Sequence, residues 1–93
     1  MDWKTYITDL DIPKDWTYNG YHHDVLPSYY VNEFIIYIDS HDKNERLRNS
    51  KEFDGRATID NLNPRFTVFS DNLNIPEELL ATDNFTEVLN FVA

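Results

Sequence analysis

Two short histidine-containing segments are the first places to look for chemistry in this chain of 93 residues. They are the pair His22-His23 and the run Asp39-Ser40-His41-Asp42. Adjacent side chains on an extended strand point to opposite faces, so the histidine pair is poorly placed to bind one ion. Asp39 and His41 share a face at their spacing, but two ligands fall short of the set that a zinc site needs. We therefore expect neither a metal site nor a cofactor.

Nucleophilic catalysis is also poorly supported by the residues present. Ser28, Ser40, Ser50 and Ser70 lie in no nucleophile-elbow motif. Two isolated glycines, Gly20 and Gly55, exclude a glycine-rich phosphate loop. The chain has no cysteine, which rules out a cysteine nucleophile and a thiolate metal site. The sequence therefore favours a protein that binds a partner and is not an enzyme.

The charge balance is strongly acidic, with 17 Asp and Glu against 8 Lys and Arg and a net charge of −9. A negative surface repels nucleic acid and anionic membranes, which argues against direct binding to either. No apolar run approaches the roughly 20 residues of a membrane span, and the start of the chain lacks the features of a signal peptide. Together with the absence of disulfides, this predicts a cytoplasmic location.

The charges are unevenly distributed along the chain. Residues 43 to 65 hold six bases and four acids, a net charge of +2, which leaves −11 for all other residues. The acids concentrate in two zones. The first zone is Asp2, Asp9, Asp11, Asp15 and Asp24, and the second is Asp71, Glu77, Glu78, Asp83 and Glu87.

Rigidly held carboxylates at these spacings approximate a line of phosphates. Acids two apart on an extended segment lie about 6.6 Å apart, and acids four apart on a helix lie about 5–6 Å apart. Phosphates advance about 3.4 Å per step along one DNA strand. A basic protein surface that grips phosphates would accept such an array, although an ordinary solvated face has the same spacing. The predicted partner-binding residues are Asp9, Asp11, Asp15, Asp71, Glu77, Glu78, Asp83 and Glu87.

An aromatic-rich stretch offers a second mode of binding. It comprises Trp16, Tyr18, Tyr21, Tyr29 and Tyr30. Its side chains suit a hydrophobic core, but Tyr and Trp are also enriched at interface hot spots. The alternative function is therefore an interaction module that binds a host protein unrelated to DNA. The same patch would support a homodimer.

The hydrophobic pattern predicts helices at both ends of the chain. Residues 2 to 10 place four apolar side chains on one face, and residues from Asp83 onward place Phe85, Val88, Leu89 and Val92 on another. Residues 74 to 78 combine Pro76 with two acids and predict a further helix entry. Residues 41 to 52 are predicted as an exposed helix or a loop.

The strands are predicted mainly in the middle of the chain. Residues 29 to 39 are rich in aromatic and β-branched types, and Phe34 to Ile38 is apolar on both faces. Residues 65 to 70 alternate and are expected to pair near residues 31 to 38. Weaker strands are expected at 16 to 21 and 53 to 59. The result is one acidic α+β domain over residues 1–93, a small antiparallel sheet with N-terminal and C-terminal helices packed against it.

In length, composition and charge the chain resembles the small early proteins of T-even phages, and among them the Arn-type anti-restriction DNA mimics. It shares with them the high content of Asp, Asn, Ile and Tyr and the lack of Cys. The resemblance implies inhibition of a restriction endonuclease of the McrBC type, or binding to a nucleoid-associated protein, in the host cytoplasm. The basic segment from Lys43 to Arg65 departs from a uniformly phosphate-like surface.

Overall fold

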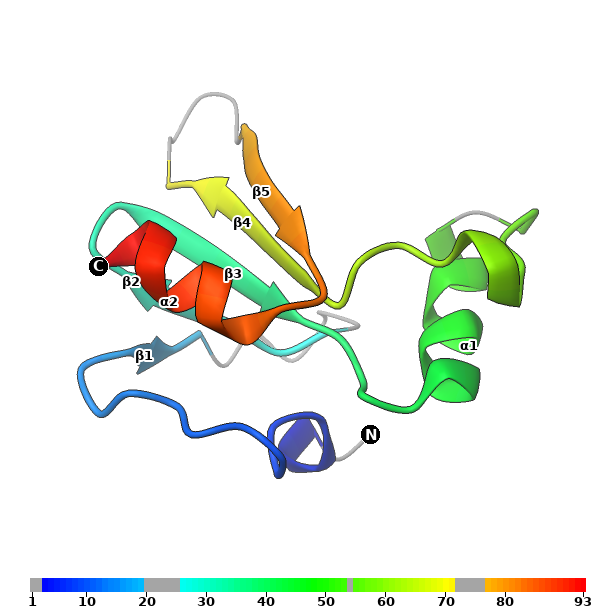
Figure 1. Ribbon diagram of the computed structural model, residues 1–93, viewed down its shortest axis with the longest axis horizontal. Coiled ribbons are helices and arrows are strands. Elements are labelled where there is room, and N and C mark those ends of the chain that lie inside the picture. Colours follow the sequence, from blue (N-terminus) through cyan, green and yellow to red (C-terminus); the bar gives the residue numbers. More distant parts are fainter. Residues whose placement is uncertain (1–2, 20–25, 54, 72–76) are drawn as a thin grey trace.

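The structure is a computed structural model that describes residues 3–19, 26–53, 55–71 and 77–93. Five antiparallel strands form one sheet in the order of the sequence (Figure 1). They are β1 (Thr17–Tyr18), β2 (Ser28–Val31), β3 (Phe34–Ile38), β4 (Phe66–Ser70) and β5 (Glu78–Thr82). The helices are η1 (Trp3–Tyr6), α1 (Lys43–Phe53), η2 (Ile59–Asn61) and α2 (Phe85–Val92). The predicted α+β class is confirmed.

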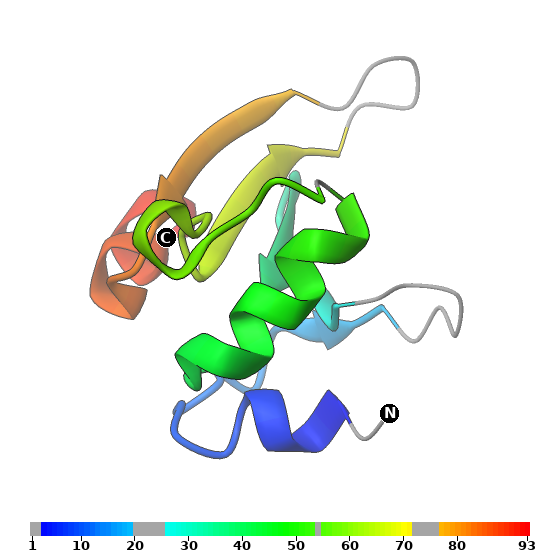
Figure 2. The ribbon, with the colours of Figure 1, turned by 90° about the vertical axis from the view of Figure 1, so that its right-hand side faces the viewer.

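The α2 helix covers one face of the sheet (Figures 1 and 2). Its predicted apolar face is confirmed, because Val88 and Val92 are buried against the side chains of Ile36 and Val68, two residues that pair directly across β3 and β4. Asn84 caps the helix by accepting a hydrogen bond of 2.9 Å from the Thr86 N–H. Each of these buried aliphatic side chains stabilises the fold by about 1.5–3 kcal/mol.

The single strand predicted over residues 29 to 39 is wrong, because a tight turn at Asn32 and Glu33 divides it into β2 and β3. Asn32 takes the left-handed conformation, with a φ of 53°, that a tight hairpin turn needs. Its side-chain amide donates a hydrogen bond of 2.8 Å to the Val92 carbonyl. The turn is therefore tied to the end of α2.

Four other predicted elements are corrected by the structure. The N-terminal helix is a single 3-10 turn over Trp3–Tyr6, and β1 covers only Thr17–Tyr18. Where a strand was predicted over residues 53 to 59, Phe53 ends α1, residues 55–56 form a turn and Ile59 begins η2. Glu78, predicted in a helix entry, begins β5 because pairing with β4 overrides its local preference; residues 74 to 76 lie outside the described residues.

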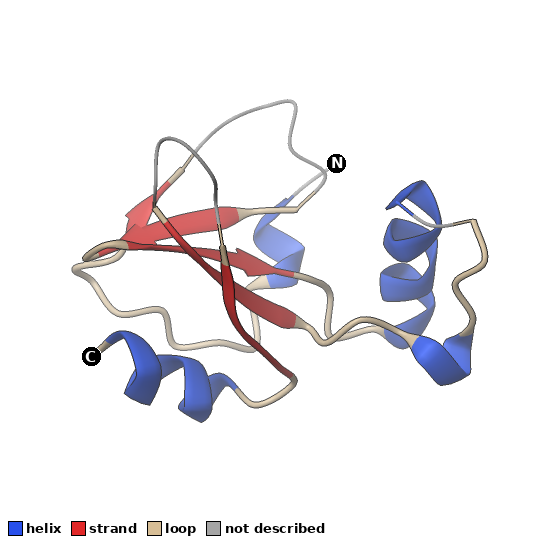
Figure 3. Ribbon diagram, turned by 90° about the horizontal axis from the view of Figure 1, so that it is seen from above, coloured by secondary structure: helices blue, strands red, loops and turns tan. Residues whose placement is uncertain are grey.

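The segment between β3 and β4 extends beyond the end of the sheet (Figures 1 and 3). We call residues 40–64 the arm and the remainder of the chain the body. The arm contains α1 and η2, so the question between helix and loop at residues 41 to 52 is answered by a helix. The arm leaves the sheet at the end opposite to the β2–β3 turn and the β4–β5 connection.

Candidate protein-binding surface

Four exposed acids gather at the end of the sheet that lies away from the arm. The Asp71 N–H donates a hydrogen bond of 2.8 Å to the Glu33 carbonyl, and the Ser70 N–H donates one of 2.8 Å to the Glu77 carbonyl. These bonds hold the β2–β3 turn beside the facing ends of β4 and β5. We call this group the acidic end. Its members are Glu33, Asp71, Glu77 and Glu78, and all are exposed.

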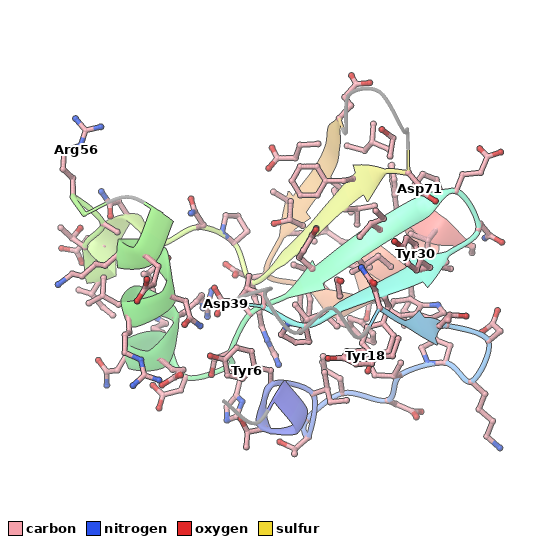
Figure 4. All side chains as sticks on the ribbon, turned by 180° about the vertical axis from the view of Figure 1, so that it is seen from behind. Tyr6, Tyr18, Tyr30, Asp39, Arg56 and Asp71 are labelled. Atoms are coloured by element: carbon pink, nitrogen blue, oxygen red, sulfur yellow. The ribbon has the colours of Figure 1, made fainter. Side chains whose placement is uncertain are left out.

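The net charge belongs entirely to the body. The arm holds five acids and five bases, whereas the rest of the chain holds twelve acids and only three bases. Asp71 and Arg56 lie at opposite ends of the molecule (Figure 4). The arm is therefore electrically neutral overall, and the acidic end is the part of the sheet farthest from its guanidinium groups.

Two of the predicted binding acids are instead paired with arginine where the arm joins the body. The Arg65 guanidinium donates two hydrogen bonds of 2.7 Å to the Asp9 carboxylate, and these bonds lower the pKa of Asp9. Asp83 accepts hydrogen bonds from the Arg46 guanidinium at 2.8 Å and from the Arg65 N–H at 2.9 Å. Asp9 and Asp83 thus help to hold the fold together.

The other six predicted acids are exposed and form no ion pair with a side chain that the structure describes. Asp71, Glu77 and Glu78 belong to the acidic end. Asp15 precedes β1, which begins at the same end of the sheet, although Lys14 lies next to it in sequence. Asp11 and Glu87 lie elsewhere, on the segment before β1 and on α2.

Asp39, the first residue of the histidine-containing segment Asp39-Ser40-His41-Asp42, is buried in a polar network. Only 5% of Asp39 and 2% of Tyr6 are exposed. The Asn49 amide donates to Asp39 at 2.9 Å and to the Tyr6 hydroxyl at 2.8 Å. Burial raises the pKa of both Asp39 and Tyr6. These groups are enclosed and hydrogen-bonded, so their role is to join the arm to the body (Figure 4).

The histidines offer no site in the described part of the chain. His41 is exposed, with its Nδ1 atom 3.9 Å from an Asp9 oxygen. His22 and His23 lie outside the described residues. Among the residues that are described, no three His, Asp or Glu side chains are grouped so as to hold a metal ion. None of the described helices is long and apolar enough to cross a membrane.

The aromatic stretch divides between the core and the surface. Trp16 and Tyr29 are buried, with the Trp16 ring 5.6 Å from Phe85 and 6.0 Å from Tyr29. Tyr18 is half-buried beside them, and Tyr21 lies outside the described residues. Tyr30 is 39% exposed and lies on the other face of the sheet. Of the predicted aromatic patch, Tyr30 is therefore the described member best placed to touch a partner.

Tyr30 belongs to a larger apolar surface that was not among the sites predicted from the sequence. Strand register places nine residues on the face opposite to α2, and we call this surface the open face. They are Thr17, Ser28, Tyr30, Ile35, Tyr37, Thr67, Phe69, Glu78 and Ala81. The signal was present in the apolar run of β3, which has hydrophobic side chains on both faces.

Glu33 was also absent from the predicted binding residues. It stood inside a predicted strand, so nothing in the local pattern linked it to Asp71 or Glu77.

Comparison of the chain with protein-family models, with curated proteins and with solved structures gives no match.

Proposed function

We propose that this protein binds a positively charged surface of a host DNA-binding protein and competes there with DNA. The observation that supports this is the separation of charge, with a neutral arm and a body that carries the whole net charge of −9. Solubility alone is served by about 2–8 net charges on a small domain. An acidic face of this kind raises the rate of encounter with a basic cleft and favours partners that bind phosphates.

The acidic end is the part of the body best suited to this contact. Its side chains come from the β2–β3 turn and from the facing ends of β4 and β5, and backbone hydrogen bonds hold these segments together, so the fold fixes where the charges are attached. Asp15 and Glu87 extend the negative field. Asp9 and Asp83 contribute less net charge, because each is paired with an arginine.

A nuclease assay tests the proposal directly. The probe is a purified modification-dependent endonuclease of the McrBC type, cutting modified DNA in the presence of increasing amounts of this protein. We expect inhibition that added duplex DNA relieves and that weakens strongly between about 0.05 M and about 0.5 M salt. A nucleoid-associated protein, tested by displacement from labelled DNA, is the second probe.

Two matched double variants locate the effect. Asp71→Asn with Glu77→Gln removes two charges from the acidic end, and Asp60→Asn with Glu52→Gln removes two from the arm. Both variants change the net charge equally, so a non-specific effect of charge would weaken them alike. We expect only the first to lose inhibition, by about tenfold or more. Absence of displacement from either probe at low salt would contradict the proposal.

A further inference from the structure

The open face is unusually apolar for a sheet surface that no described helix covers. An antiparallel sheet with one solvated face normally alternates apolar and polar residues. Here Tyr30, Ile35 and Phe69 form a row across β2, β3 and β4, because Ile35 pairs with both of the others. The Tyr37 ring packs edge-on against Phe69 with a centroid distance of 5.7 Å. A contiguous patch of this kind is typical of an interaction site.

Charge identifies the chemistry of the partner. Glu78 of β5 extends the row by one strand, since it pairs with Phe69 of β4. Asp71 and Glu33 lie at the same end of the face. A partner that covers the apolar row therefore meets carboxylates at one margin, which favours Lys or Arg there. A second copy of the chain is disfavoured, because it would bring another net charge of −9 and the same acids.

The way that the opposite face is covered favours a helix as the occupant. On the opposite face, α2 lies against the sheet with Phe85, Val88, Leu89 and Val92. A helix with one apolar side and one charged side is the element that covers such a sheet face. Tyr30 faces the viewer in Figure 4, where α2 lies behind the sheet. Both faces thus present apolar side chains, and one of them is already covered by a helix of this chain.

We propose that the open face binds a basic amphipathic helix of the partner protein. Its apolar side packs on Tyr30, Ile35 and Phe69, and its Lys or Arg side chains lie against Glu78 and Asp71. This inference rests on the proposed function for the sign of the partner's charge. It goes further by assigning the short-range contact to a specific face, whereas competition with DNA requires only the acids.

The test uses a synthetic peptide of about 18 residues, or five helical turns, with Leu on one side and Lys on the other. A scrambled peptide of the same composition is its control. Titration by calorimetry gives the affinity, and amide chemical shifts locate the bound peptide. We expect the amphipathic peptide to bind more tightly than the scrambled one and to shift the amides of Tyr30, Ile35 and Phe69.

Matched variants separate the two faces. Tyr30 and Phe91 are 39% and 42% exposed on opposite sides of the sheet, so Tyr30→Ser and Phe91→Ser remove similar exposed surface. We expect Tyr30→Ser to weaken peptide binding by about tenfold or more and Phe91→Ser to leave it unchanged. Glu78→Gln and Glu52→Gln, the latter on the arm, make the same comparison for charge.

The possible failures are distinguishable. Equal binding of both peptides, or equal loss from Tyr30→Ser and Phe91→Ser, would overturn the open-face inference and leave the charge-based function intact. Peptide binding at the open face without any displacement of DNA would overturn the proposed function and keep the docking site. Failure of both peptides to bind at low salt would overturn the inference and count against the function.

Discussion

The arm and the sheet differ in what they bury. The centre of the sheet buries aliphatic side chains such as Ile36 and Val68, neither of which is exposed at all. The junction between the arm and the body buries Arg46, Asn49 and Arg65, which are 8%, 3% and 8% exposed. Apolar burial tolerates small shifts, whereas a buried polar network is costly when any member loses its partner. The attachment of the arm therefore depends on a few directional contacts.

This difference also explains the distribution of charge. Arg46 holds the arm to the body through Asp83, and Arg65, the first body residue after the arm, pairs with Asp9 beside that junction. They are used within the fold, so the neutral arm offers little positive charge to offset the acidic end. The acidic end and the open face lie on the body, which is held by its own apolar core.

The largest effect is expected for Arg65→Ala. This side chain donates to Asp9, to the Tyr6 carbonyl at 2.9 Å and to the Asp39 carbonyl at 2.9 Å. Its loss leaves buried acceptors unpaired, so the free energy of unfolding is expected to fall by about 3–5 kcal/mol. Urea denaturation measures the change. Arg65→Lys keeps the charge but lacks the paired donors of the guanidinium. A fall in the free energy of unfolding of less than about 1 kcal/mol in both variants would contradict a stabilising role for Arg65.

Asn49→Ala is expected to loosen the arm and spare the sheet. The substitution removes a donor shared by Asp39 and the Tyr6 hydroxyl, at a cost of about 1–3 kcal/mol. Hydrogen exchange should become faster for the amides of α1, while those of β3 and β4 keep their protection. Exchange that accelerates equally in all of these elements would show that the arm and the body unfold as one unit.

Ile36→Val gives the complementary result from the core. Removing one buried methylene typically costs about 0.5–1.5 kcal/mol, and no polar partner is lost. We expect the amides of α2 and the sheet to lose protection together, with no selective opening of α1. Leu79→Ala, on the exposed edge strand β5, is the control and should change stability by less than about 0.5 kcal/mol.

Local sequence patterns correctly predicted the elements whose buried face can be recognised from the spacing of apolar residues within one segment. The β4 strand and the apolar face of α2 follow from alternation and from helical spacing. The entry predicted at residues 74 to 78 failed at Glu78, because β5 depends on pairing with β4. The turn at Asn32 was missed since no glycine or proline marks it. Asp9 and Asp83 pair with arginines 56 and 37 residues away, a choice that depends on topology.

The smallest effect at neutral pH is expected for Asp39→Asn, and its informative feature is the pH dependence. Asparagine keeps an oxygen that can accept the bonds from Asn49 and the Ser40 N–H. Burial raises the pKa of Asp39, so the folded protein holds this proton more tightly than the unfolded chain does. The contribution of Asp39 to the stability of the parent protein therefore falls as pH rises through and above the ordinary Asp range.

Asp39→Asn should remove that loss, so the variant gains stability relative to the parent protein as pH increases.

The contribution of Asp9 to stability changes with pH in the opposite direction. Its lowered pKa stabilises the fold above the ordinary Asp range, and this contribution disappears as pH falls through the folded-state pKa. Asp9→Asn should therefore be most destabilising near neutral pH. Urea denaturation of the three proteins from about pH 3 to about pH 8 tests both signs, and parallel pH profiles would show that other groups control acid stability at the junction.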